Sequence, residues 1–220
     1  MIDLAIYGNY VFDTIYTRGG VKQRFGGIAN VERYTTVSSR IVRCTEGSAV
    51  VIDDGGSTKA VANLQEKVFT PTIVDAKWYH IAYVDCIPDI GFGAELNGII
   101  SADYAEKVEE IPEWVDYVFC SDEDWDWSIK RPARLKAMII HSSTRVCVYL
   151  CNQGSMERAD TWSSYMFEIK CRNDIEVLGA GDMLASFTIS EMIKGGDLYE
   201  SVKKAVENTR KTLEDRSAKN

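Results

Sequence analysis

The 220-residue chain lacks the features that mark several common classes of protein. Basic residues are not in surplus: 25 lysines and arginines face 33 acids, for a formal net charge of −8. A nucleic-acid-binding surface needs a basic face, and an acidic surface disfavours anionic membranes. No apolar run approaches a membrane span, and the opening Met1–Gly8 has neither the basic flank nor the apolar length of a signal peptide. We therefore expect a cytoplasmic protein whose partners are neither nucleic acids nor membranes.

Cysteine and histidine are too sparse to suggest a disulfide framework or a metal centre. The six cysteines include no Cys-x-x-Cys pair and lie mostly in apolar runs, which is typical of free thiols in a reducing compartment. Cys147 and Cys151 would need further ligands to hold zinc, and His80 and His141 are the only histidines. A Ser–His–Asp signature and a Walker-type glycine-rich loop with its lysine are also missing. Any phosphate site must therefore be built in another way.

Short apolar runs alternate with helical stretches along the chain. The opening run Leu4–Tyr7 predicts a buried strand ending at Gly8, and a helix is expected over 28–39. Two further helices are expected near the end of the chain, over 181–194 and 199–214. This alternation predicts one α/β domain with a layered, mostly parallel sheet flanked by helices. The other expected strands are 40–44, 48–52, 78–84, 98–102, 117–120, 137–140 and 146–150.

The most informative stretch is a small-residue turn that leads into a helix. Gly179, Ala180 and Gly181 come directly before Asp182 and a helical segment. Small residues let the backbone approach a ligand, and a helix start offers unpaired N–H groups and the positive end of a dipole. Such a turn binds anions, and an acid at its rim suits a base that deprotonates a hydroxyl attacking a phosphoryl group. The alternative is an ordinary first-turn acid, which stabilises a helix by itself.

Four stretches, in this order, resemble the ribokinase-like (PfkB) carbohydrate kinase family. Gly8–Asp13 is similar to the family's first strand and its substrate-binding aspartate, and Phe25–Val31 resembles the Gly-Gly…Asn first signature. The Gly-Ala-Gly-Asp turn resembles the second signature, which opens a penultimate helix. Ala205–Asn208 is similar to a stretch whose asparagine lies near the adenine. The similarity therefore extends over the whole chain.

The resemblance implies ATP- and Mg2+-dependent transfer of a phosphoryl group to a hydroxyl of a small sugar-like or nucleoside-like substrate. Asp182 would be the base, and the N–H groups of Gly179, Ala180 and Gly181 would neutralise the transferring phosphate. The carboxylate of Asp13 can accept hydrogen bonds from two vicinal hydroxyls. Turn, cap or surface roles remain the alternatives for the acceptor-binding residues and for Asn208. The residues implied to bind the acceptor are Asp13, Gly26, Gly27 and Asn30.

The nucleotide side departs from the family's pattern. Ser121 and Asp124 stand where the family has an Asn-x-x-Glu region linked to magnesium and phosphates, with Glu123 between them. We expect Ser121, Glu123 and Asn208 to contact the nucleotide and Asp124 to hold magnesium through water, a capping cluster being the alternative. His141–Thr144 replaces the Thr-x-Gly turn that usually meets ATP. Glu176 and Val177 stand for the acid and threonine that help to hold a monovalent cation, which leaves that cation in doubt.

The chain is also a shortened member of the family it resembles. One or two strand–helix units of the sheet edge are missing after the first signature, and a small β-sheet lid is expected over 11–25 and 40–62. Such a lid exposes apolar surface unless it closes or dimerises, so a homodimer through the lid is implied. Two functions stay open: a kinase with altered nucleotide contacts, or a catalytically degenerate module that binds a sugar or nucleotide without turnover. Convergence of Asp13, Asn30 and Asp182 on one cleft is the structural test of the resemblance.

Overall fold

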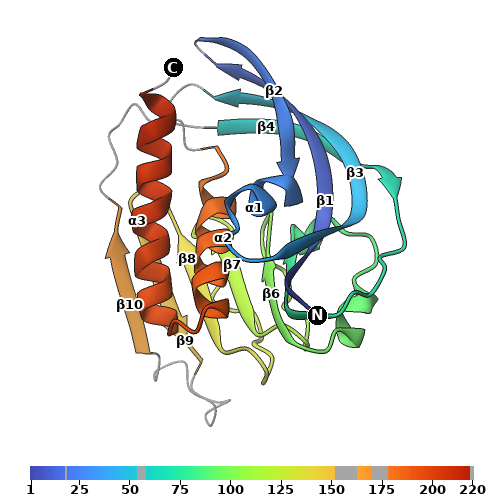
Figure 1. The fold of residues 1–220 in the computed structure, drawn as a ribbon, viewed down its shortest axis with the longest axis vertical. Helices are drawn as coiled ribbons and strands as arrows, with labels where there is room; N and C mark the ends of the chain where they lie inside the picture. The colour runs from blue at the N-terminus through green and yellow to red at the C-terminus, as the bar shows by residue number, and fades with distance from the viewer. Residues whose placement is uncertain (18, 54–57, 152–162, 170–177, 219–220) are drawn as a thin grey trace.

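The computed structural model describes residues 1–17, 19–53, 58–151, 163–169 and 178–218. Ten strands form one sheet in the order β10-β9-β8-β7-β6-β5-β1-β3-β4, with β2 paired to β1 (Figure 1). The strands from β3 to β8 in this order run parallel, while β9 and β10 add antiparallel strands at one edge. The predicted layered, mostly parallel α/β sheet is confirmed. The strands are β1 (Ile2–Thr17), β2 (Gly20–Gly27), β3 (Ser39–Asp53), β4 (Thr58–Val68), β5 (Ala76–Ala82), β6 (Ile99–Asp103), β7 (Tyr117–Ser121), β8 (Ala137–His141), β9 (Arg145–Leu150) and β10 (Ser163–Glu168).

The first strand runs from the centre of the sheet into the lid without a break. We expected it to end at Gly8, but a register shift between Gly8 and Asn9 bends the strand and it continues to Thr17. Gly8 has a φ of 144°, and a Cβ there would lie 2.4 Å from the carbonyl oxygen of Ala82, so this position requires glycine. β3 is likewise one long strand with an irregularity between Glu46 and Ser48, where two short strands were expected.

The outer half of β1 pairs with β2 and β3, and β3 pairs with β4. These strands form the lid, which extends beyond the parallel sheet at the end opposite the N-terminus (Figure 1). The expected lid segments 11–25 and 40–62 lie in these strands, except for residues 18 and 54–57, which fall outside the described residues.

All three α-helices pack on one face of the sheet. They are α1 (Ile28–Tyr34), α2 (Ala180–Ile193) and α3 (Leu198–Ser217), and α2 and α3 lie side by side (Figure 1). α1 ends earlier than expected, because the two residues after Tyr34 bond to α2 instead of continuing the helix: the N–H of Thr36 donates to the hydroxyl of Ser190 over 3.1 Å. This contact joins the N-terminal third of the chain to its end. The apolar residues buried between helices and sheet include Leu4, Ile6, Ile28, Val31, Phe119, Ile139, Leu184, Ile189 and Val202.

The opposite face of the parallel sheet is covered by loops and two 3-10 turns, η1 (Val84–Cys86) and η2 (Gly91–Glu95). We expected helices between several of these strands, but none forms between β5 and β9, a region described throughout. Each of the three long connections contains one proline, which interrupts a helix. The loops nevertheless bury a core of their own against the sheet. The prolines are Pro88, Pro112 and Pro132, and the buried loop residues include Val84, Leu96, Val108, Val115 and Leu135.

Two expectations from composition can be compared with this structure. No helix among the described residues is long and apolar enough to cross a membrane. The described cysteines are free thiols, as expected, and Cys171 lies outside the described residues. They are Cys44, Cys86, Cys120, Cys147 and Cys151.

Candidate active site

Parallel strands bring polar side chains to one edge of the sheet. Asp103 ends β6, Ser121 ends β7 and His141 ends β8, while Tyr83 directly follows β5. The carboxyl edge of a parallel sheet is where ligands bind in open α/β folds. All four residues line one cleft together with Asp182 near the start of α2, so the edge of the sheet and the helix form a common site.

Two clefts meet at the start of α2. The first, of about 920 Å³, lies between the lid and the sheet, and we call it the lid cleft. The second, of about 860 Å³, lies between α3 and the turns that follow β7 and β8, and we call it the helix cleft. Gly179, Gly181 and His141 line both clefts, so a group at this junction can be reached from either side.

The carboxyl of Asp182 is held by two neutral donors. The residue is only 6% exposed and lies in the first turn of α2. Tyr83 donates its hydroxyl to Oδ1 over 2.9 Å, and Asn30 donates its amide to Oδ2 over 3.0 Å. Because the donors come from the sheet edge and from α1, the orientation of the carboxyl is set by three separate parts of the chain.

The environment of Asp182 shifts its ionisation into the neutral range. Burial, followed by the charge of Asp103, raises the pKa of Asp182 to about 7, while the hydrogen bonds from Tyr83 and Asn30 act in the opposite direction. Asp103 is itself 7% exposed, accepts a hydrogen bond from the backbone N–H of Tyr83, and has its Oδ2 3.4 Å from Nε2 of His80. A carboxyl with a pKa near 7 can act as a general base at neutral pH.

The predicted acceptor residues converge on the lid cleft. Asp13 lies on the inner face of β1, is 7% exposed, and lines the cleft with Asn30 and Asp182. Burial raises the pKa of Asp13, and the charges of Arg24 and Arg33 oppose that shift. The side-chain oxygen of Asn30 accepts a hydrogen bond from Arg33 over 3.1 Å while its amide binds Asp182. The structural test set by the sequence, one cleft for all three residues, is thus met.

The two glycines of the first signature allow close approach within the lid. A Cβ on Gly26 would lie 2.1 Å from Oδ2 of Asp13, so the aspartate rests directly against this backbone. Gly27 has a φ of 59°, and a Cβ there would lie 2.1 Å from the carbonyl oxygen of Asn9. Gly27 lines the lid cleft, whereas Gly26 supports Asp13 from behind.

The glycine turn at the start of α2 forms a candidate anion site. Gly179 precedes the helix with a φ of 78°, and as the N-cap residue it has no side chain that could bond to the first N–H groups. Nη2 of Arg24 lies 3.8 Å from the position of a Cβ on Gly179. Nε and Nη2 of Arg24 are buried without a hydrogen-bond partner among the described residues. A guanidinium with unused donors thus adds positive charge to the turn formed by Gly179, Ala180 and Gly181.

The residues expected on the nucleotide side are more open. Ser121 lines both clefts, Glu123 is exposed at the helix cleft, and Asp124 lines the lid cleft. The hydroxyl of Ser121 accepts a hydrogen bond from the backbone N–H of Glu123 over 3.3 Å, which closes a local turn. Burial, followed by the charges of Glu123, Glu106 and Asp122, raises the pKa of Asp124.

The structure does not bring Asn208 together with the other residues expected on the nucleotide side. It is exposed on α3 and lines neither cleft, although the next residue, Thr209, lines the helix cleft. Its place near an adenine stays a prediction. Glu176 and Val177, which bear on the monovalent cation, lie outside the described residues.

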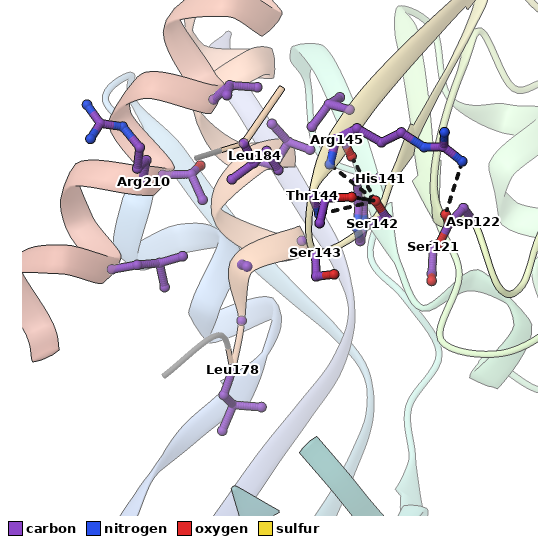
Figure 2. A pocket seen from close by; sticks show the side chains of 18 of the residues that line it. Ser121, Asp122, His141, Ser142, Ser143, Thr144, Arg145, Leu178, Leu184 and Arg210 are labelled. Carbon is purple, nitrogen blue, oxygen red and sulfur yellow. Dashed lines mark hydrogen bonds and ion pairs between the residues drawn. The ribbon is translucent and has the colours of Figure 1, made fainter. Parts of the chain in front are cut away.

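The wall of the helix cleft that follows β8 is short and polar. Figure 2 shows His141, Ser142 and Thr144 between the Ser121 turn and Arg210 of α3. The hydroxyl of Ser142 accepts hydrogen bonds from the N–H groups of Thr144 and Arg145, at 3.3 and 3.2 Å. The turn that replaces the expected Thr-x-Gly is therefore closed by its own side chain.

Three residues of the site are missing from the sequence-based prediction. Asp103 had a usable signal, because it ends a buried apolar run in the same way as Ser121 and His141. No sequence signal identified Tyr83, because its place in the site depends on an unusual backbone conformation. Its φ of 55° is the one positive φ of a non-glycine residue in the described ranges. Arg24 looks like a solvated strand residue, and its place beside Gly179 depends on how the lid folds over the helix.

Comparisons with known proteins bear on the fold. No protein-family model and no curated protein sequence matches the chain. Among solved structures, adenosine kinase from Anopheles gambiae has a TM-score of 0.71 at 13% identity, over 97% of this chain and 96% of that one. Nucleoside kinase from Methanocaldococcus jannaschii, an archaeal member of the ribokinase family, has a TM-score of 0.69 at 15% identity, over 97% and 92%. Ribokinase from Arabidopsis thaliana, solved with ribose and ATP, has a TM-score of 0.69 at 12% identity, over 97% and 93%.

These likenesses extend along almost the whole of each chain, and the proteins concerned are sugar and nucleoside kinases. At such low identities they establish the fold and leave the activity to be argued from the site. The resemblance read from the sequence is confirmed at that level, and the chain has the α/β fold of the ribokinase-family kinases.

Proposed function

We propose that this protein transfers the terminal phosphoryl group of ATP to a hydroxyl of a small sugar-like or nucleoside-like acceptor. One observation carries the proposal: Asp182, a buried carboxyl with a pKa near neutrality, lines the lid cleft from the first turn of α2, next to Gly181, which lines both clefts. A base next to an anion site suits phosphoryl transfer, which depends mainly on positioning and on stabilisation of charge.

The lid cleft would hold the acceptor. Asp13 contributes a carboxylate and Asn30 an amide to the lining of the cleft that also contains Asp182. The carboxylate of Asp13 can accept hydrogen bonds from two neighbouring hydroxyls, as a sugar ring offers them. The backbone of Gly26 and Gly27 would keep Asp13 in place and let the acceptor approach the main chain.

Asp182 would act as the general base. In its ionised form it removes the proton from the acceptor's hydroxyl, whose oxygen bonds to the terminal phosphorus as the bond from phosphorus to the ADP oxygen breaks. The N–H groups of Gly179, Ala180 and Gly181, with the guanidinium of Arg24, would offset the charge of the transferred group. Ser121 and Glu123 would contact the donor from the helix cleft.

The side chains near the junction fit magnesium only in part. Within the described residues, no group of three or more metal-ligating side chains is gathered. Asp124 lies among other acids that raise its pKa, and a divalent cation would relieve that repulsion. Magnesium keeps several waters and binds through one or two carboxylates and phosphate oxygens, so Asp124 would hold it through water. Bound there, the ion would neutralise charge on the donor's phosphates.

An ATP-consumption screen of the purified protein tests this function. Sugars, sugar phosphates and nucleosides are offered with magnesium, and Asp182→Asn is assayed beside Asp89→Asn, a matched change at an exposed residue outside both clefts. We expect acceptor-dependent ADP formation that Asp182→Asn lowers by about 10²–10⁴-fold while acceptor binding persists. Binding of ATP or a sugar with no turnover for any acceptor would instead favour the degenerate binding module.

The outer face of the lid supports a homodimer. Side chains that point away from the lid cleft form an exposed apolar face on a small sheet, and such faces mark interaction surfaces. Ile52→Lys should convert the dimer into a monomer in sedimentation velocity, and an unchanged sedimentation coefficient would contradict a lid interface. The residues of this face are Phe12, Tyr16, Val50, Ile52 and Val61.

A further inference from the structure

The ring of His141 stands at the junction of the two clefts and has no part in the roles assigned so far. His141 ends β8 and lines both clefts. Its Nε2 lies 3.0 Å and its Cε1 3.2 Å from the position that a Cβ would take on Gly181. The ring therefore packs against the first turn of α2 because residue 181 carries no side chain. It lies beside the N–H groups that the proposed function gives to the phosphate.

The imidazole of His141 is free to bind a ligand. Among the described residues its ring has no hydrogen-bond partner, and its one hydrogen bond outside the sheet ladder is made by the backbone carbonyl, which accepts from the N–H of Asp122 over 2.9 Å. The other histidine differs: His80 is fully buried, places Nδ1 2.9 Å from the hydroxyl of Ser101, and lines neither cleft. One histidine is thus part of the core and the other is available at the site.

The surroundings keep His141 neutral until a charge arrives. Burial lowers the pKa of His141, and the charges of Asp103 and Asp122 oppose that shift. Arg145 lies 3.9 Å from Asp122 and offsets part of its charge. An anion at the start of α2 would add the negative charge that favours the protonated ring. The charged residues that share a cleft lining with His141 include Asp103 of β6, Asp122, Glu123 and Asp124 after β7, Arg145 of β9, Asp182 of α2 and Arg210 of α3.

We propose that His141 binds the phosphates of the donor as an imidazolium, so that donor binding takes up a proton at this ring. The inference rests on the proposed function, because it assumes a phosphate donor at the start of α2. Imidazolium nitrogens donate charge-assisted hydrogen bonds to phosphate oxygens, and histidine changes charge in the physiological range. His141 thereby supplies positive charge at a site that has no Walker-type lysine.

Because the chain has two histidines, proton uptake can be observed directly. The full chain is titrated with MgADP near pH 7.5 while the histidine ring resonances are followed by NMR. We expect the His141 ring to shift to the protonated position and the His80 ring to stay unchanged. Calorimetry in two buffers of different ionisation enthalpy should show uptake of roughly 0.5 to 1 proton by the wild-type protein.

Two variants separate charge from shape. His141→Gln keeps a side-chain donor but cannot be protonated, so proton uptake should fall by the share of this ring, leaving only that of Asp182, whose pKa of about 7 an anion would also raise. MgADP affinity should fall about tenfold near pH 7. His141→Lys carries its charge at every pH tested, so MgADP affinity should no longer decline between pH 6.5 and 8.5. MgADP binding that leaves the His141 ring neutral, or equal proton uptake in His141→Gln, would overturn the inference and leave the proposed kinase intact. A failure of every variant and of the wild-type protein to bind MgADP would overturn the ATP-dependent function as well.

Discussion

The lid cleft and the helix cleft share the start of α2 but are built in different ways. In the lid cleft the polar side chains hold one another across the fold: Asn30 bonds to Asp182 and Arg33, and Tyr83 bonds to Asp182. In the helix cleft the hydroxyls of Ser121 and Ser142 bond locally, each to an N–H two or three residues later, while the longer-range links run through the backbone and the Arg145–Asp122 pair. The polar side chains of one cleft are therefore fixed by one another across the fold, and the hydroxyls of the other by the turns in which they lie.

The two clefts also differ in how closely their residues follow the pattern that the sequence resembles. Asp182 bonds to partners from two other parts of the chain and cannot change without disturbing both, and the lid cleft contains the residues that the resemblance predicts. A turn such as Ser142–Arg145 needs only its own hydroxyl to close, so its other side chains can vary. The donor would then be held mainly by the main chain of α2 and by whichever side chains border the helix cleft.

The largest expected difference between the two clefts is in how an acid of each one affects the pH dependence of protein stability. The pKa of Asp182 is about 7 in the folded chain against an ordinary value of 3.8. Above about pH 4 the unfolded chain releases the proton that the folded chain still holds, so the free energy of unfolding decreases as the pH rises from about 4 to 7. Asp182→Asn should remove this loss and be more stable than wild type at pH 8 by roughly 2–4 kcal/mol, measured by urea unfolding. Glu123→Gln, an exposed acid of the helix cleft, should follow the wild-type curve. An equal pH dependence in Asp182→Asn and wild type would contradict the assignment.

Gly26→Ala should damage the lid cleft alone. Its Cβ would displace the carboxylate of Asp13, so we expect acceptor affinity to fall by about 100-fold, the loss of one or two charge-assisted hydrogen bonds. Nucleotide binding in the helix cleft should stay within twofold, as measured by calorimetry with MgADP. Gly19→Ala, in the same hairpin, is the matched control, because its Cβ would lie 3.7 Å from Oγ1 of Thr17, an ordinary contact distance. Equal losses of acceptor and nucleotide would mean that the clefts are not separate.

Tyr83→Phe should alter the base without emptying the cleft. The hydroxyl of Tyr83 lowers the pKa of Asp182 and orients its carboxyl. We expect turnover to fall about tenfold and the acidic limb of the pH–rate profile to move to higher pH. Tyr7→Phe, which removes a hydroxyl bonded to the carbonyl of Thr72, should affect stability but leave the pH profile in place. A pH–rate profile of Tyr83→Phe that coincides with that of the wild-type protein would contradict a role of Tyr83 in positioning Asp182.

The smallest effect is expected on the nucleotide side. Ser121→Ala removes a hydroxyl that closes a local turn at 3.3 Å, so the KM for ATP should change by no more than about threefold. Steady-state kinetics with the acceptor held at saturation measures it. A loss as large as that of Gly26→Ala would break the comparison, because it would place an indispensable side chain in the helix cleft.

Much of the lid cleft could be predicted because several of its residues belong to short, recognisable sequence patterns. The glycines at 26–27 and 179–181 and the acid that opens α2 belong to short sequence patterns that can be recognised without the rest of the fold. The long course of β1 past Gly8 could not be predicted, since a bend and a strand end look alike in sequence. Neither could the loop-covered face, where loops that contain Pro88, Pro112 and Pro132 stand in place of the expected helices. Tyr83 and Arg24 escaped because their roles depend on contacts that exist only after folding.

The hydrogen bond between Asn30 and Asp182 joins residues 152 positions apart, and it has a consequence for synthesis. A growing chain displays the lid, α1 and the parallel strands long before α2 leaves the ribosome, because synthesis runs from the N-terminus. Until then the apolar surface around Ile28 and Val31 lacks its cover, and Asp182 has not been synthesised. The protein therefore gains the proposed base and its last layer of core in the same step. A chain interrupted before that step would lack Asp182 and would expose an apolar surface that favours aggregation.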